Sequence, residues 1–143
     1  MNSIMAFQTG FHVTVTGGAF TNMGWATRPD QIGNPNRDFT FSVDQAFNTK
    51  AFARPAQFQF GTAPRGSVEL PGIKNVDLSI FKNTRVRERL NVQFRFEMFN
   101  AANHPNFSCF DCLPSRNFDS SAFGRIFAAS DPRLIQFALK LLY

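Results

Sequence analysis

The sequence contains little charge and no long apolar run. Charged residues make up 17% of its 143 residues, whereas soluble domains usually carry about a quarter. The apolar runs span only a few residues, which excludes a transmembrane helix. Residues 1–5 also lack the basic region and the long apolar stretch of a secretory signal. An exported chain requires such a signal, so we expect either a soluble domain or a piece of a longer protein.

Cysteine is scarce too. Cys109 and Cys112 are the only two, and they stand in C-x-x-C spacing. A lone pair cannot supply the four ligands of a structural zinc site, and His104 is the only histidine nearby. A redox motif would need a strand before the pair and a helix start after it, and neither is indicated. A loop disulfide and two free thiols both stay open, and no metal or cofactor is expected.

Catalytic patterns are missing as well. His12 and His104 lie far apart in the chain, and the Asn-His-Pro context of His104 favours a hydrogen-bonded loop role. Serine, histidine and aspartate show no nucleophile spacing, and there is no phosphate-binding loop. The net charge of +5 comes from scattered basic residues apart from the run 85–89, so nucleic acid is not an expected partner. The chain is not expected to be an enzyme.

What the sequence does contain is phenylalanine, with 19 residues against one tyrosine and one tryptophan, and alternation of apolar with polar residues. The last stretch, 135–143, predicts a strand with one apolar face because its apolar residues recur with a period of two. Its nine residues are close to the roughly 9–11 that a tilted strand needs to cross a bilayer. The apolar face would carry Ile135, Phe137, Leu139, Leu141 and Tyr143.

The stretch 89–99 shows the strictest alternation. One face would carry the apolar residues Leu90, Val92, Phe94, Phe96 and Met98. The opposite face would carry the polar residues Asn91, Gln93, Arg95 and Glu97. In a soluble sandwich the apolar face would meet a second sheet. In a membrane barrel it would face lipid, while the polar face would line the lumen.

The rest of the chain predicts fewer and weaker elements. Gly10 is a weak point or a bulge in the first strand, and Pro and Gly are too dense after it for continuous ladders. About five antiparallel strands result, fewer than the minimum of about eight for a membrane barrel. We therefore expect an all-β fold that forms the end of a larger barrel. The further elements are a strand at 4–16, an irregular excursion at 17–74 with one or two helical turns in 44–53, a strand at 75–82, a polar turn at 83–88, a strand at 123–129 and a tight turn at 130–133.

Several segments together resemble the carboxyl-terminal end of Oar-like TonB-dependent transporters. The similar segments are 28–35, 47–52, 71–82, 93–100, 103–107, 123–126 and 131–140. The resemblance covers nearly the whole chain, although 69–72 reads Glu-Leu-Pro-Gly where the family usually has Arg-Gly-Pro-Gly. It implies that residues 1–143 are the carboxyl-terminal part of a barrel of about 22 strands. The plug and the segment that contacts TonB would be absent.

The resemblance also implies a cellular location and a function. The chain would lie in the outer membrane of a Gram-negative bacterium, as part of a barrel for substrate uptake that is not transport-competent alone. Its partners would be lipid, the remaining barrel and plug, and the assembly machinery, which would read Phe137, Leu139, Leu141 and Tyr143. With a periplasmic carboxyl terminus, five strands would place the segments 17–74 and 100–122 in the periplasm. The alternative is a soluble β-sandwich binding or adhesin-like module.

Overall fold

The computed structural model describes residues 1–17, 27–88, 90–107 and 113–142, and in these residues the fold is all-β with one 3-10 turn. The chain divides into two compact units. Unit 1 consists of Met1–Gln8, Ile73–Asn106 and Ser130–Tyr143, and unit 2 of Thr9–Gly72 and Phe107–Ala129. No helix in the described residues is long and apolar enough to cross a membrane.

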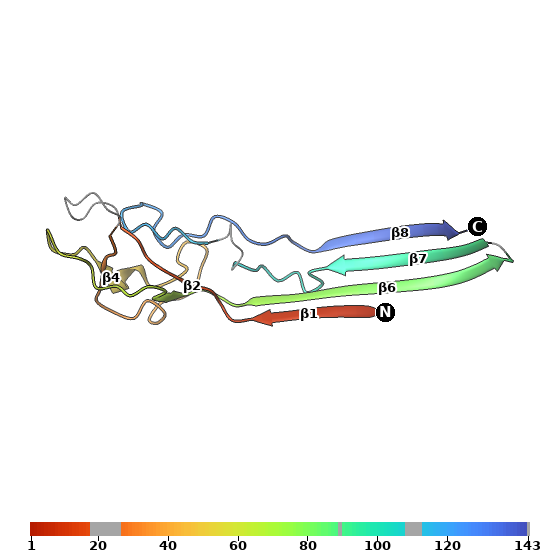
Figure 1. Cartoon of the computed structure of the whole chain (residues 1–143), viewed down its shortest axis with the longest axis horizontal. Coiled ribbons are helices and arrows are strands. Elements are labelled where there is room, and N and C mark those ends of the chain that lie inside the picture. The colour runs from red at the N-terminus through yellow and green to blue at the C-terminus, as the bar shows by residue number, and fades with distance from the viewer. Residues whose placement is uncertain (18–26, 89, 108–112, 143) are drawn as a thin grey trace. The chain divides into compact units, whose positions relative to one another are not determined.

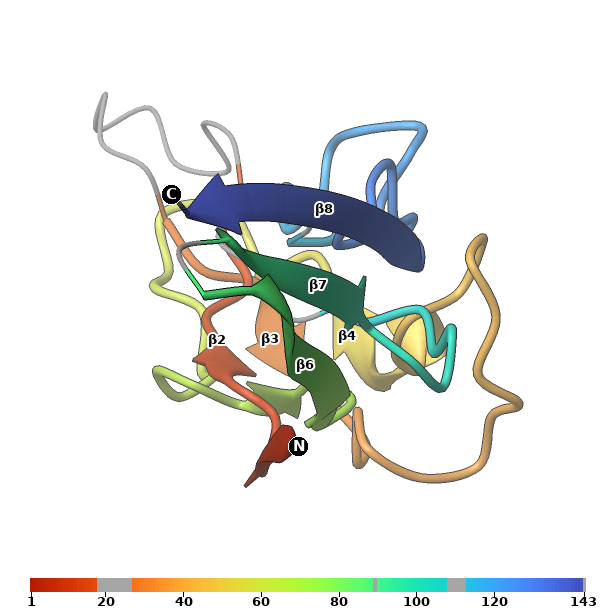
Figure 2. The same ribbon diagram turned by 90° about the vertical axis from the view of Figure 1, so that its right-hand side faces the viewer.

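Unit 1 is a single antiparallel sheet. Its strands are β1 (Asn2–Gln8), β6 (Ile73–Arg87), β7 (Leu90–Phe99) and β8 (Leu134–Leu142), in the spatial order β1-β6-β7-β8 (Figure 1). Figure 2 looks along the strands from the hairpin end, where β6, β7 and β8 lie side by side in one layer. The sheet is open, because β1 and β8 are its two edges. This confirms the expected all-β fold with antiparallel strands.

The register of the sheet fixes which residues share a face. β7 and β8 pair without a shift from Asn91↔Leu142 to Phe99↔Leu134. β6 and β7 pair regularly until a bulge between Arg85 and Arg87. β1 covers β6 only from Ile73 to Ser79, so the remaining eight residues of β6 have no partner on that side among the described residues.

Two expected strands appear as predicted, and one is absent. β7 and β8 follow the predicted stretches 89–99 and 135–143, except that residues 89 and 143 lie outside the described residues. The predicted strand at 123–129 is wrong. Gly124 has a φ of +84°, which ends any extended run, and the Ile126 amide donates to the Val43 carbonyl rather than to a sheet neighbour. Ile126 is also buried in the core of unit 2.

The boundaries of the other two expected strands also change. The polar residues of 83–87 continue β6 instead of forming a turn, and of the predicted turn only Glu88 lies outside the strand. The first strand breaks at Gly10 into β1 and the short β2 (His12–Val13). A Cβ at Gly10 would lie 1.5 Å from the Leu70 carbonyl oxygen, so the backbone packs there at a distance that only glycine permits.

The strand count decides where the long segments join the sheet. β1 ends at Gln8, opposite Ile73 at the start of β6, and β7 ends at Phe99, opposite Leu134 at the start of β8. Both long segments therefore leave and re-enter the sheet at the end opposite Leu142. The prediction that 17–74 and 100–122 lie on the same side as the carboxyl terminus is wrong, because it counted a strand at 123–129 that does not form.

Unit 2 has its own hydrophobic core, so the predicted excursion at 17–74 is less irregular than expected. Phe47, Val15 and Val68 are fully buried in it. Rings of Phe47 and Phe123 pack edge to face with centroids 5.2 Å apart. One 3-10 turn, η1 (Thr49–Ala51), replaces the predicted helical turns. Unit 2 also contains two pairs of short strands. β2 pairs with β5 (Val68–Glu69), and β3 (Asp30–Gln31) pairs with β4 (Phe52–Ala53).

Candidate functional site

One face of the unit 1 sheet is apolar across three strands. On β7 it carries the five predicted residues Leu90, Val92, Phe94, Phe96 and Met98, since alternate residues of a strand share a face. The register adds Ile135, Phe137, Leu139 and Leu141 from β8 and Val76, Leu78 and Ile80 from β6. These side chains meet across strands: the Phe137 ring centroid lies 5.2 Å from that of Phe96 and 6.3 Å from that of Phe94.

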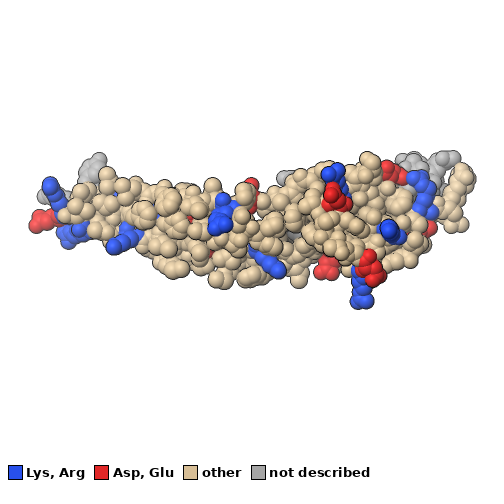
Figure 3. All heavy atoms as spheres, turned by 180° about the vertical axis from the view of Figure 1, so that it is seen from behind, with Lys and Arg blue, Asp and Glu red and all other residues tan. Residues whose placement is uncertain are grey.

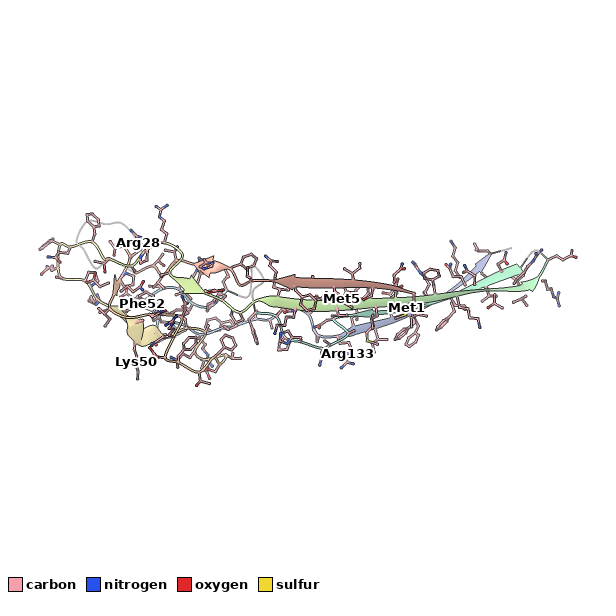
Figure 4. The ribbon with its side chains drawn as sticks, turned by 90° about the horizontal axis from the view of Figure 1, so that it is seen from below. Met1, Met5, Arg28, Lys50, Phe52 and Arg133 are labelled. Carbon is pink, nitrogen blue, oxygen red and sulfur yellow. The ribbon has the colours of Figure 1, made fainter. Side chains whose placement is uncertain are left out.

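This apolar face is uncovered. Phe137 and Leu139 are each 66% exposed, and Phe94 is 43% exposed. β1 continues the face with Met5, labelled in Figure 4, which pairs with Val76 and is 64% exposed. Soluble proteins rarely expose a contiguous apolar surface of this extent without a partner for it. The structure thus places the predicted apolar residues of β7 and β8 on one face of the sheet, and this face is exposed.

The opposite face is mixed but richer in polar groups. It carries the predicted Asn91, Gln93, Arg95 and Glu97 of β7. The Gln93 amide nitrogen donates to the Asn83 side-chain oxygen of β6 at 2.8 Å. The Arg95 guanidinium and the Glu97 carboxylate stand 3.8 Å apart on the same strand. Arg95 and Glu97 also line a cavity of about 230 Å³ with Asp77 and Ser79.

A network centred on Asn100 joins β6, the turn after β7 and the entrance to β8. Asn100 is 7% exposed and has a φ of +47°. Its backbone N–H donates to the Asp77 carboxylate at 2.9 Å. Its side-chain amide donates to the carbonyls of His104 at 3.0 Å and Asp131 at 3.2 Å, while its side-chain oxygen accepts from the His104 N–H at 3.0 Å. One residue thus holds three segments together, through its backbone N–H to β6 and through its side chain to the turn after β7 and the entrance to β8.

Asn106 makes a second link at the same end of the sheet. It is 5% exposed. Its side-chain oxygen accepts from the Lys74 N–H at 2.8 Å, and its amide donates to the Lys74 carbonyl at 3.1 Å. The side chain therefore forms both hydrogen bonds with the backbone of Lys74, the second residue of β6, as a neighbouring strand would. Asn103 completes the set by accepting from the Arg133 N–H at 3.1 Å.

Asn100 and Asn106 border a cavity of about 600 Å³ in unit 1. It lies at the end of the sheet where the long segments leave. Asn75, Asp77, Asn100, Asn106 and Asp131 supply its polar lining, and Ile73, Phe99 and Leu134 supply much of its apolar lining. The sequence did not identify this cluster. Its only signal was the asparagine spacing after a strand, which is typical of side-chain-closed turns.

The other residues considered in the sequence are the two histidines, the two cysteines and Tyr143. His12 belongs to β2 in unit 2, where it pairs with Glu69, and His104 uses its backbone groups in the Asn100 network of unit 1. The described ranges hold no group of three or more histidine, cysteine, aspartate or glutamate residues that would suit a metal ion. Cys109, Cys112 and Tyr143 lie outside the described residues.

A family model described as an outer membrane beta barrel domain matches residues 1–136. No curated protein and no solved structure matches the chain.

Proposed function

The chain belongs to the family of outer membrane β-barrel domains and is a barrel protein of the outer membrane, and from that premise we propose that its sheet is the carboxyl-terminal part of a TonB-dependent uptake barrel. The observation that carries the proposal is the uncovered apolar face of unit 1, with Phe137 and Leu139 each 66% exposed, backed by a more polar face. A wall between lipid and a wet lumen needs this pair of faces.

In this proposal the apolar face meets lipid and the opposite face lines the lumen. Lipid would contact Phe94, Phe96 and their neighbours on the same face. Arg95 and Glu97 would lie in the lumen, where charge costs little because water reaches it. A soluble sandwich would need a second sheet over the apolar face, and unit 1 supplies none among its described residues.

The sheet alone does not form a barrel. Membrane barrels contain at least about eight strands, and the described part of unit 1 has four with two open edges. Unpaired backbone groups are costly inside a bilayer, so β1 and β8 require neighbouring strands. We assign these strands to the remainder of a larger barrel. Four strands without them are not transport-competent.

The four-strand sheet also leads to a consistent orientation. If the carboxyl terminus is periplasmic, the Glu88 hairpin is periplasmic too, because Leu142 pairs with Asn91 beside that hairpin. Residues 9–72 and 100–133 then leave the sheet on the extracellular side. Short periplasmic turns and long extracellular loops are the usual arrangement in such barrels, so this orientation replaces the one derived from five strands.

TonB dependence and uptake rest on the sequence resemblance. The plug and the TonB-contacting segment would belong to other parts of the protein, and the assembly machinery would read Phe137, Leu139, Leu141 and Tyr143. No catalytic role is assigned to any residue. An in-frame plug-coding region upstream of this sequence in the gene would support this finer part of the proposal, and an upstream region that encodes an unrelated protein would count against it.

The membrane assignment is tested with the 143-residue chain itself. We expect the chain, diluted from urea into buffer, to aggregate because the apolar face has no cover. Diluted into vesicles of a neutral phosphatidylcholine, where copies of the chain can pair through their β1 and β8 edges, it should gain strand content in far-ultraviolet circular dichroism and co-float with the lipid. A sharp monomeric peak in size-exclusion chromatography without detergent, together with cooperative unfolding, would favour the soluble alternative.

A further inference from the structure

Basic side chains gather where β6 and β7 meet. Residues 82–89 include four basic residues and one acidic residue. Figure 3 shows Lys and Arg side chains at this hairpin end of the sheet, on the left of the view. Such a group of charges at one end of a strand pair differs from the scattered distribution in the rest of the chain.

Two of these basic residues stand on the apolar face. Lys82 pairs with Phe94, so its side chain lies on the same face as the Phe94 ring. The bulge between Arg85 and Arg87 brings Arg87 opposite Leu90 instead of leaving it on the other face. The bulge thus places a second cation on the apolar side, at the pair that follows the last regular pair, Arg85 with Asn91.

Neither cation is neutralised by the described residues. Lys82 and Arg87 are both exposed, and the ion pairs formed by the described part of the chain do not include them. Arg85 differs, because its guanidinium donates to the Glu88 carbonyl at 2.9 Å and closes the hairpin. Lys82 and Arg87 are therefore available to an external anion.

The position of Lys82 matches the boundary of an apolar band. Lys74 and Lys82 are eight residues apart on β6, or about 26 Å at roughly 3.3 Å per residue. Between them this face carries only Val76, Leu78 and Ile80. The lipid-facing band of membrane barrels is about 25 Å tall and their strands tilt by roughly 35–45°, so this stretch of β6 crosses about 20 Å of its height. Lys82 then stands near one edge of the band, because only Val92, Leu90 and Leu141 of the described residues continue the apolar face beyond it. Its long side chain lets the ammonium extend toward water at that edge, and Arg87 stands still closer to the hairpin.

We propose that Lys82 and Arg87 bind the phosphates of anionic phospholipid headgroups in the leaflet at the hairpin end. This inference rests on the proposed function, because it requires the apolar face to meet lipid. The ligand must carry an anionic group directly beside hydrocarbon, since Phe94 and Leu90 adjoin the two cations. A phospholipid meets both requirements, whereas nucleic acid would leave the adjoining apolar residues in water.

The test measures partitioning of the 143-residue chain into vesicles of phosphatidylcholine alone and of phosphatidylcholine with about a third phosphatidylglycerol. A double variant, Lys82→Gln with Arg87→Gln, removes the two cations. Lys50→Gln with Arg65→Gln, both exposed residues of unit 2, removes the same charge elsewhere; Figure 4 labels Lys50. Lys82→Arg with Arg87→Lys keeps the charge. Circular dichroism in neutral vesicles checks that each variant forms the sheet.

The wild-type chain should partition more strongly when phosphatidylglycerol is present. The Lys82 and Arg87 double variant should lose about tenfold or more of its affinity for the anionic vesicles, at about fivefold per cation, and keep its affinity for neutral ones. The unit 2 control and the charge-preserving variant should behave as wild type. Equal losses in the two charge-removing variants, or no gain of wild type from the anionic lipid, would overturn the inference. Failure of wild type to enter neutral vesicles would instead contradict the proposed function.

Discussion

Phe96 of β7 and Phe137 of β8 lie directly opposite each other, with ring centroids 5.2 Å apart and Phe137 66% exposed. The two rings therefore stabilise the pairing of the strands while leaving most of one ring uncovered. A cross-strand aromatic pair contributes up to about 1 kcal/mol, but the exposed area needs a separate explanation. Lipid supplies it, because the rings would then be buried against hydrocarbon.

The facing of β7 predicts a difference between two substitutions on that strand. Met98→Lys places an ammonium on the lipid face, opposite Leu78 and midway between Lys74 and Lys82, and should cost about 2–4 kcal/mol because such a position is near the bilayer midplane. Gln93→Lys places it on the lumen face and should cost less than about 1 kcal/mol. The measurement is urea-induced unfolding of the vesicle-refolded chain. Equal losses for the two variants would mean that the two faces are wrongly assigned.

The alternation in residues 89–99 and 135–143 was sufficient to predict both strands and which of their residues share a face. Two errors have different physical causes. Residues 83–87 form strand although most of them are polar, because they pair with residues 90–93 of β7. Residues 123–129 are not strand although they are apolar, because Gly124 adopts a positive φ and Ile126 is buried in a core that no local pattern reveals.

The Asn100 network could not be predicted for a similar reason. Asn100 and Asp77 are 23 residues apart in the chain, and only the pairing of β6 with β7 brings them together. The sequence did mark residues 103–107 as a recurring segment of the resembling family. It gave no indication that Asn100 and Asn106 are buried or that their side chains fix the entrance of β8.

Removal of the Asn100 side chain should loosen that entrance. Asn100→Gly keeps the backbone compatible with a φ of +47° and removes the bonds to His104 and Asp131. Loss of buried hydrogen bonds of this kind costs about 1–3 kcal/mol. Hydrogen exchange followed by mass spectrometry should show faster exchange at the His104 amide. Asn91→Gly, at an exposed position of β7, is the control, and equal exchange at His104 in both variants would argue against the network.

The close approach of the backbone at Gly10 predicts that a side chain at this position would disrupt unit 2 locally. Gly10→Ala would put a Cβ 1.5 Å from the Leu70 carbonyl oxygen, so the two backbones must separate, at a cost of about 3 kcal/mol or more. The pairing of β2 with β5 should weaken, which faster hydrogen exchange at Val13 and Leu70 would report. Gly33→Ala is the matched control, because its Cβ would find its nearest neighbour at 3.5 Å. Unchanged exchange in Gly10→Ala would show that the close approach is not required.

The central claim, that the apolar face of the sheet meets lipid, is tested most directly by fluorescence quenching with brominated phospholipids. In a Trp25→Phe background, which removes the only native tryptophan, Phe137→Trp and Gln136→Trp place the probe on opposite faces of β8. After refolding into vesicles, the Phe137→Trp protein should emit at shorter wavelength and be strongly quenched by bromine in the acyl chains, whereas the Gln136→Trp protein should emit at longer wavelength and be quenched little. Equal quenching at the two positions, or stronger quenching for Gln136→Trp, would contradict the account.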